Sequence, residues 1–167
     1  HSPSVAIQGY LQAGSLADPD EKLGLAGFTA GCLMRGTQDR DFQEIYEALE
    51  SAGARLGIGG GVHTTGFHGQ ALAEDLDLLL DTLSEVLTRP LFPTVYVERL
   101  RTQYLTGLAM RAQDTEEMAS LICNQLLFGE HPYSRPSDGY TQTIQAITRE
   151  DLVDFHRRNY GPREMTV

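Results

Sequence analysis

The sequence predicts an α+β fold in which helices pack against an antiparallel sheet. Short stretches near the amino terminus and in the first half alternate apolar with other residues, which is typical of strands that bury one face. Longer stretches repeat their apolar residues at helical spacing, and these dominate the second half. Helices that are segregated from antiparallel strands are typical of α+β domains.

In the first half, alternation predicts strands and glycines mark the helix ends. Residues 4–13 alternate with a period of two and form the first predicted strand. Helices are predicted at 25–36 and 42–53, and each ends at a glycine. Residues 54–72 contain two predicted strands, 54–58 and 62–72, separated by three glycines that mark a turn or bulge.

In the second half, helical stripes are separated by residues that stop helices. Pro90 stops a leucine-rich stripe that begins at Leu76, and Phe92-Pro93 opens the next helix. Asp114 has the spacing of a capping residue for a helix that ends at Gly129. The remaining predicted elements are helices at 141–147 and 149–158 and a strand that begins at 165. Because this strand looks incomplete, we expect residues 1–167 to be a single domain, truncated at its carboxyl terminus and part of a longer chain.

Composition narrows the classes of function. The chain has 167 residues, 41% of them hydrophobic, and a formal net charge of -10. This charge argues against nucleic acid and anionic membrane as partners; it serves solubility or forms an acidic wall that attracts basic peptides. No signal peptide or membrane-spanning stretch is recognisable, which favours a cytoplasmic location. Cys32 and Cys123 lie among apolar residues of predicted helices, so we expect buried free thiols, with a disulfide left open.

The helix predicted at 25–36 carries a known pattern. From Gly24 to Thr37 the chain reads Gly-Leu-Ala-Gly-Phe-Thr-Ala-Gly-Cys-Leu-Met-Arg-Gly-Thr. This segment resembles the signature helix of the pitrilysin/insulinase zinc metallopeptidases, the inverted zincins, which reads Gly-Leu-Ala-His-Phe-x-Glu-His-x-Leu-x-x-Gly-Thr. In that family the His-x-x-Glu-His core supplies two zinc ligands and a general base. The matching positions here are Gly27, Ala30 and Gly31.

The resemblance covers nearly the whole chain. Five further segments resemble the family in the same order, namely 13–15, 50–54, 92–101, 131–136 and 147–152. It implies a LuxS/pitrilysin-type metallopeptidase-like domain. The family's third zinc ligand, a glutamate, corresponds to about Gly107. None of the four corresponding residues can ligate zinc, so the resemblance implies neither catalytic nor metal-binding residues in this domain.

The resemblance also implies a role without chemistry. Family members are built from four related domains or two paired half-subunits, and only one domain carries zinc. This chain therefore resembles a non-catalytic domain copy that shapes the chamber and pairs with a zinc-bearing half. No cofactor is expected here, and zinc is expected in a partner domain. The expected partners are other domains, or a paired subunit, of the same family.

An extended peptide is a further expected partner. In active relatives a sheet edge takes the peptide by strand addition. The corresponding edge strand is predicted here at 62–67, which comprises Val62, His63, Thr64, Thr65, Gly66 and Phe67.

Two alternatives remain open. One is a structural or assembly subunit like the core proteins of respiratory complexes, and the other is an independent hydrolase with an unrecognised site. Cys32 with a distant histidine is a possible nucleophile pair, but its apolar surroundings raise the thiol pKa. His63 and His68 lie five residues apart on a predicted strand and point to opposite faces, which argues against a shared metal. His156 is expected to be a hydrogen-bonded core histidine.

Overall fold

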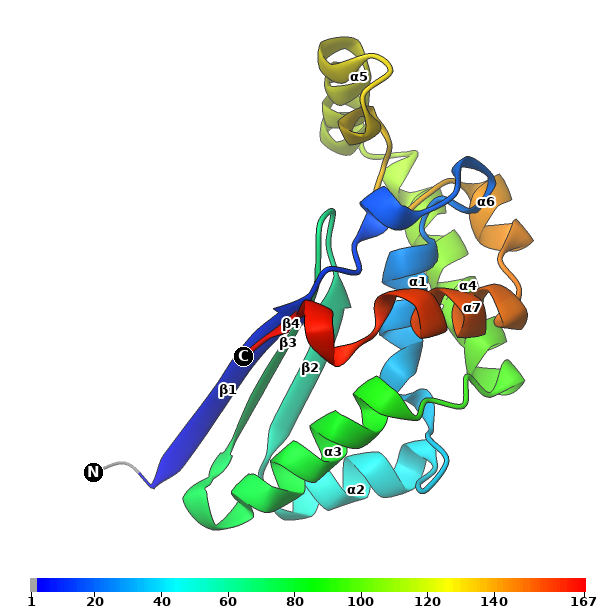
Figure 1. Ribbon diagram of the computed structural model, residues 1–167. Coiled ribbons are helices and arrows are strands. Elements are labelled where there is room, and N and C mark those ends of the chain that lie inside the picture. Colours follow the sequence, from blue (N-terminus) through cyan, green and yellow to red (C-terminus); the bar gives the residue numbers. More distant parts are fainter. Residues whose placement is uncertain (1–2) are drawn as a thin grey trace.

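The structure, a computed structural model that describes residues 3–167, has an α+β architecture (Figure 1). Short 3-10 turns join several of the helices and strands. The strands and α-helices, in chain order, are β1 (Ser4–Leu11), α1 (Leu25–Cys32), α2 (Phe42–Ser51), β2 (Arg55–Gly60), β3 (Thr65–Leu72), α3 (Leu76–Thr88), α4 (Thr94–Arg111), α5 (Thr115–Phe128), α6 (Thr141–Ala146), α7 (Arg149–Asn159) and β4 (Met165–Thr166).

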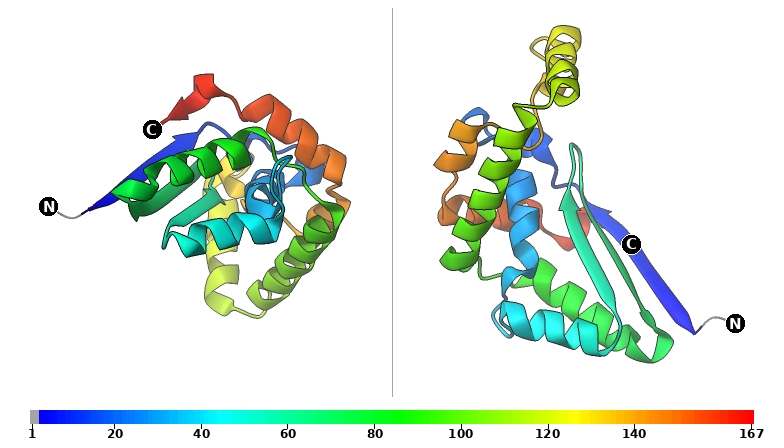
Figure 2. Two further views of the ribbon diagram at one scale, coloured as in Figure 1. Left: turned by 90° about the horizontal axis from the view of Figure 1, so that it is seen from below. Right: turned by 180° about the vertical axis from the view of Figure 1, so that it is seen from behind.

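The four described strands form one antiparallel sheet in the order β2-β3-β1-β4. β1 pairs with β3 along its whole length, whereas β4 pairs only with Tyr10 and Leu11 of β1. Helices cover one face of the sheet, as the views in Figures 1 and 2 show. Along β3, Phe67 is therefore buried while His68 and Gln70 are exposed on the other face.

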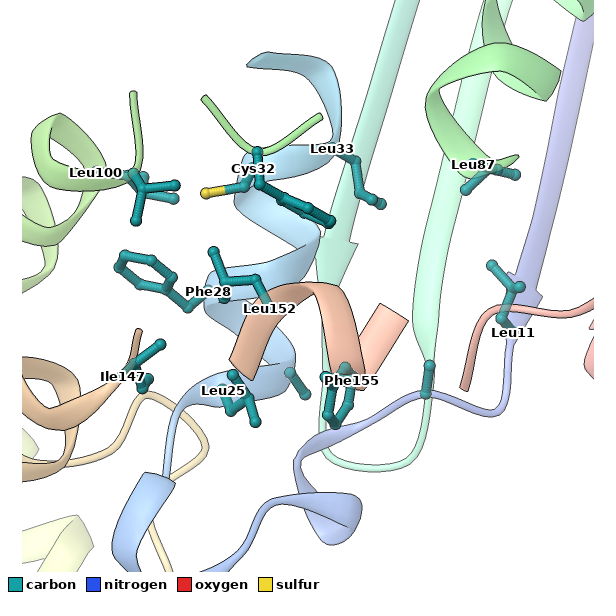
Figure 3. Close-up of a cluster of buried hydrophobic side chains, with 14 of the residues drawn as sticks. Leu11, Leu25, Phe28, Cys32, Leu33, Leu87, Leu100, Ile147, Leu152 and Phe155 are labelled. Atoms are coloured by element: carbon teal, nitrogen blue, oxygen red, sulfur yellow. The ribbon is translucent and has the colours of Figure 1, made fainter. Parts of the chain in front are cut away.

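The core has two clusters. The larger one surrounds α1, where Phe28 and Cys32 meet Leu100 of α4 and Leu152 of α7 (Figure 3). The smaller one fills the space between α2, α3 and the sheet. Helix α1 is therefore the buried centre of the domain, which agrees with its almost wholly apolar sequence.

Several local predictions are confirmed. The α1 segment ends through a 3-10 turn at Gly36, whose φ of 130° lies in the region that favours glycine. Asp114 caps α5, because its carboxylate accepts hydrogen bonds from the backbone N–H groups of Glu116 and Glu117 at 2.9 and 3.1 Å. The final strand predicted from residue 165 is present as β4.

The structure corrects the position of the predicted edge strand. Val62, His63 and Thr64 belong to the hairpin turn, where the N–H of Gly61 donates to the carbonyl of Thr64 at 2.8 Å. Residues 65–67 begin β3, which pairs with β2 on one side and with β1 on the other. The turn comes later than the three glycines suggest, because Gly59 and Gly60 still pair with β3. The free edge beside α1 is therefore β2.

The expectation of two buried thiols is half wrong. Cys32 is fully buried, but Cys123 is exposed on α5, and both are free. Helix α5 buries none of its residues and projects from the body of the domain (Figures 1 and 2). A helical apolar stripe predicts a helix, but it does not show whether the same chain covers that stripe.

Candidate functional site

The amino terminus of α1 is held by a buried carboxylate. The Asp18 side chain accepts hydrogen bonds from the backbone N–H groups of Gly24 and Ala26, both at 2.8 Å. These bonds satisfy donors that the first turn of a helix leaves free. Burial nevertheless outweighs them and raises the pKa of Asp18 to about 6. The loop before α1 thus fixes the position of the signature helix.

The three motif positions on α1 are small, and α4 fills the space beside two of them. A Cβ atom at Gly31 would lie 3.0 Å from Cδ2 of Leu100, and one at Gly27 would lie 3.3 Å from the Tyr104 hydroxyl. Ala30 is buried. Leu100 and Tyr104 therefore crowd the positions where the family pattern places two imidazoles.

Two ionisable groups beside the motif, Tyr104 and Cys32, keep their protons at neutral pH. Burial raises the pKa of the Tyr104 hydroxyl to about 12, and its ring packs edge-to-face on Phe28 with centroids 5.2 Å apart. Burial likewise raises the pKa of the Cys32 thiol to about 12. A thiol with so high a pKa is a poor nucleophile at neutral pH, because the thiolate is the reactive form.

Position Gly107 does not take part in this packing. It is exposed, and a Cβ atom added there would meet no atom within 4 Å. The α4 side chains that adjoin the α1 motif positions are instead Leu100 and Tyr104. Across residues 3–167, no cluster of three or more His, Cys, Asp or Glu side chains is arranged to hold a metal ion.

The end of β2 lies directly beside the motif. A Cβ atom at Gly60 would lie 2.8 Å from the Cα of Gly27, so the strand and the helix approach each other through glycine backbones. The free edge of the sheet therefore adjoins the degenerate motif. Sequence reasoning placed this edge too far along the chain, although the glycines of β2 mark the close approach.

Three of the histidines that the sequence singles out, His63, His68 and His156, lie outside the motif helix. His63 shares a hydrogen bond of 2.9 Å with the Tyr133 hydroxyl, whereas His68 is exposed on the open sheet face. The Nε2–H of His156 donates a 2.9 Å hydrogen bond to the carbonyl of Leu87, so the predicted hydrogen bond is present, but the side chain is half-buried and not fully enclosed in the core. Burial lowers its pKa in spite of that bond.

Comparison with known proteins supports the resemblance of residues 24–37 to the family's signature helix. The family model described as insulinase (peptidase family M16) matches residues 1–146. The chain belongs to this insulinase family. A zinc protease of Mycobacterium tuberculosis, itself described as uncharacterized, is 30% identical over 167 residues, which are 100% of this chain and 38% of the relative. The beta subunit of the mitochondrial-processing peptidase of Saccharomyces cerevisiae is 26% identical, again over 100% of this chain and 36% of the relative.

The fold of this insulinase-family chain matches a solved structure of the same family. The crystal structure described as a peptidase M16 inactive domain from Pseudomonas fluorescens has a TM-score of 0.93 at 28% identity, covering 98% of this chain and 40% of that one. The chain thus spans about two fifths of the length of these relatives. No helix within the described residues is both long enough and apolar enough to cross a membrane.

Proposed function

We propose that this chain is a zinc-less, non-catalytic domain of an insulinase-family peptidase, which shapes the substrate chamber and pairs with a zinc-bearing half. One observation carries the proposal. The motif frame is kept on α1, yet Gly27 and Gly31 adjoin Tyr104 and Leu100 instead of presenting ligands. Two imidazoles and a carboxylate are what the family chemistry requires of this helix.

The open face of the sheet is suited to line a chamber. Its exposed residues include Gln8 and Tyr10 on β1 and His68 and Gln70 on β3. Antiparallel sheets can leave one face to solvent while the other packs on helices. A wall of this kind contributes shape and hydrogen-bonding groups without catalytic chemistry. The net charge of -10 would add an attraction for basic peptides.

The free edge of β2 is the surface for an extended peptide in this proposal. It is the outer strand beside α1, and its sequence, Arg-Leu-Gly-Ile-Gly-Gly, is poor in side chains that would block an approaching backbone. Strand addition takes its affinity from main-chain hydrogen bonds and requires no metal. Such binding is compatible with the loss of the motif residues.

The zinc-bearing half belongs either to the same longer chain or to a separate subunit. The yeast relative is by its name one subunit of a processing peptidase, and the Pseudomonas structure is described as an inactive domain. Both descriptions fit a division of labour between domains. The partner expected here carries an intact His-x-x-Glu-His segment.

The test is to purify the full-length protein alone and together with a family member that carries an intact motif. We expect cleavage of a quenched, unstructured peptide only when the intact motif is present, and its loss when the motif glutamate is changed to glutamine. Zinc measured after dialysis should follow the motif-bearing half. Peptidase activity of the protein without any intact motif would contradict the proposal, and a stable complex without activity would favour an assembly subunit.

A further inference from the structure

A cavity of about 310 Å3 lies beyond the end of β2, between the hairpin turn and the segment that follows α5. Figure 1 shows the β2–β3 turn pointing toward this segment. We propose that the cavity binds an aromatic side chain of an extended peptide. The placement of that peptide along β2 rests on the proposed function. The preference for an aromatic ring is argued independently, from the residues that line the cavity.

The walls of the cavity are aromatic and apolar. Tyr133 contacts Phe128 edge-to-face with centroids 5.4 Å apart and His63 in the same manner at 5.5 Å. Val62, Leu23 and two prolines add apolar surface, and Ser15 and Arg135 supply the polar part of the lining. Aromatic rings favour such edge-to-face partners, and a cavity of this size suits a single large side chain.

The cavity is both accessible and held in shape. Val62, Phe128 and Tyr133 are 40%, 36% and 39% exposed, so solvent reaches the lining. The Tyr133 hydroxyl is fixed by its hydrogen bond to His63, and its backbone N–H donates to Nδ1 of His131 at 3.2 Å. A wall that is positioned in advance reduces the entropy lost when a ligand binds.

Charge at the rim favours a neutral ligand. Arg135, the one charged residue among the lining, forms an ion pair of 2.7 Å with Asp20. Its guanidinium is therefore already balanced by a carboxylate. An anionic group would have to compete with Asp20, whereas a neutral aromatic ring would leave the pair intact.

The cavity lies within reach of a peptide on β2. β2 ends at Gly60, and Val62 and His63, two and three residues further along the chain, line the cavity. An extended chain advances about 3.3 Å per residue, so a peptide paired along β2 that continues about two residues past the level of Gly60 would come level with the hairpin turn. Main-chain pairing along β2 and one aromatic anchor would then act on the same peptide.

The experiment measures binding of capped ten-residue Ser/Thr peptides to the full-length protein by fluorescence anisotropy. One peptide has a single phenylalanine, a second has alanine in its place, and each is also made with alternate backbone nitrogens methylated. Loss of the phenylalanine should weaken binding about tenfold or more. The V62F variant, which fills the cavity from an exposed turn, should reduce that preference to less than about twofold. The V95F variant, which places the same ring at an exposed valine at the start of α4 outside the cavity lining, is the matched control.

A photo-crosslinking version of the peptide, with p-benzoylphenylalanine at the aromatic position, should label Val62, Phe128 or Tyr133. Equal affinity for the phenylalanine and alanine peptides, or labelling elsewhere, would overturn the cavity. If N-methylation leaves affinity unchanged while the phenylalanine preference remains, strand addition is wrong and the cavity stands. If the phenylalanine and alanine peptides bind equally tightly and N-methylation abolishes the binding of both, strand addition is supported and the proposed aromatic site is rejected. Absence of binding by all the peptides would overturn both.

Discussion

At the scale of single residues, the structure shows two separate changes at the motif. The zinc ligands are absent, and α4 side chains fill the space beside their positions. Gly27 and Gly31 could each be replaced in sequence, but Leu100 and Tyr104 already lie beside them. Histidines introduced at these two positions would therefore collide with side chains of α4 before they could bind a metal ion. This crowding makes the degenerate motif a packed interface between two helices.

The crowding leads to a prediction about engineered metal binding. The G27H/G31H variant should gain no stability from zinc, because Cδ2 of Leu100 and the Tyr104 hydroxyl oppose both imidazoles. Adding L100V and Y104F removes these atoms, at a cost of about 1 kcal/mol for the methylene lost from Leu100. In that background, zinc at about five times its Kd should raise the free energy of unfolding by about 1 kcal/mol.

Urea titration with and without zinc measures this effect, and the L100V/Y104F variant without histidines is the control. Equal zinc stabilisation of G27H/G31H in both backgrounds would show that α4 does not obstruct the motif positions.

The two cysteines should differ sharply in reactivity. Cys32 is fully buried and its pKa is raised to about 12, whereas Cys123 is exposed on α5. A disulfide-exchange reagent should therefore modify one thiol per native chain and two in denaturant. The C123S variant should show no native reaction. Rapid native labelling of that variant would mean that α1 opens far more readily than its packing suggests.

At the scale of elements, Asp18 couples the position of α1 to pH. Its pKa is about 6 in the folded protein and 3.8 for an unperturbed aspartate, so the folded state binds more protons between these limits. The stabilisation by protonated Asp18 is complete below about pH 4 and is lost as pH rises through about 6. Over this window the free energy of unfolding should change by up to about 3 kcal/mol relative to a residue that does not titrate.

The D18N variant supplies that comparison. Its amide oxygen can still accept from the first turn of α1, but it carries no ionisable proton. Chemical denaturation at several pH values should show the stability difference between wild type and D18N shifting in favour of wild type as pH falls from about 7 to about 4. Parallel pH profiles for the two proteins would rule out the raised pKa.

Helix α5 is the element that this chain leaves uncovered. Its apolar residues Ile122, Leu126 and Leu127 are 50%, 82% and 70% exposed. The helix touches mainly the turn Pro132–Ser134. Contiguous exposed apolar residues of this kind are typical of surfaces that meet another protein or domain.

At the scale of the whole molecule, these surfaces predict association of the isolated domain. Besides α5, the outer edge of β1 is covered by β4 only at Tyr10 and Leu11 within the described residues. Light scattering over a dilution series should show concentration-dependent oligomers, because exposed strand edges and apolar stripes pair readily. The L126Q/L127K variant should weaken association about tenfold or more, which corresponds to removing about 1.4 kcal/mol of apolar burial.

The V95Q variant is the matched control, because Val95 is also exposed, at 69%, but lies at the start of α4. It should leave association unchanged. A monomer at all concentrations for the wild-type domain would show that neither surface is adhesive by itself.

The sequence by itself determined the α+β class, the order of the elements and the family frame. These follow from short-range signals: the period of apolar residues, the glycine after α1 at Gly36, and the cap Asp114. The sequence alone also shows that Gly27, Ala30 and Gly31 have no side chain that could bind zinc. Each of these properties depends on residues that are neighbours along the chain.

Only the tertiary structure decided which strand is the edge, what occupies the motif and which apolar residues stay exposed. Whether β2 or the segment at 62–67 lies outermost depends on pairing with β1, which is distant in sequence. The contact of Leu100 with Gly31 and the exposure of Leu126 likewise depend on how helices dock. Local periodicity specifies a buried face for each element, but the partner of that face is set by long-range packing.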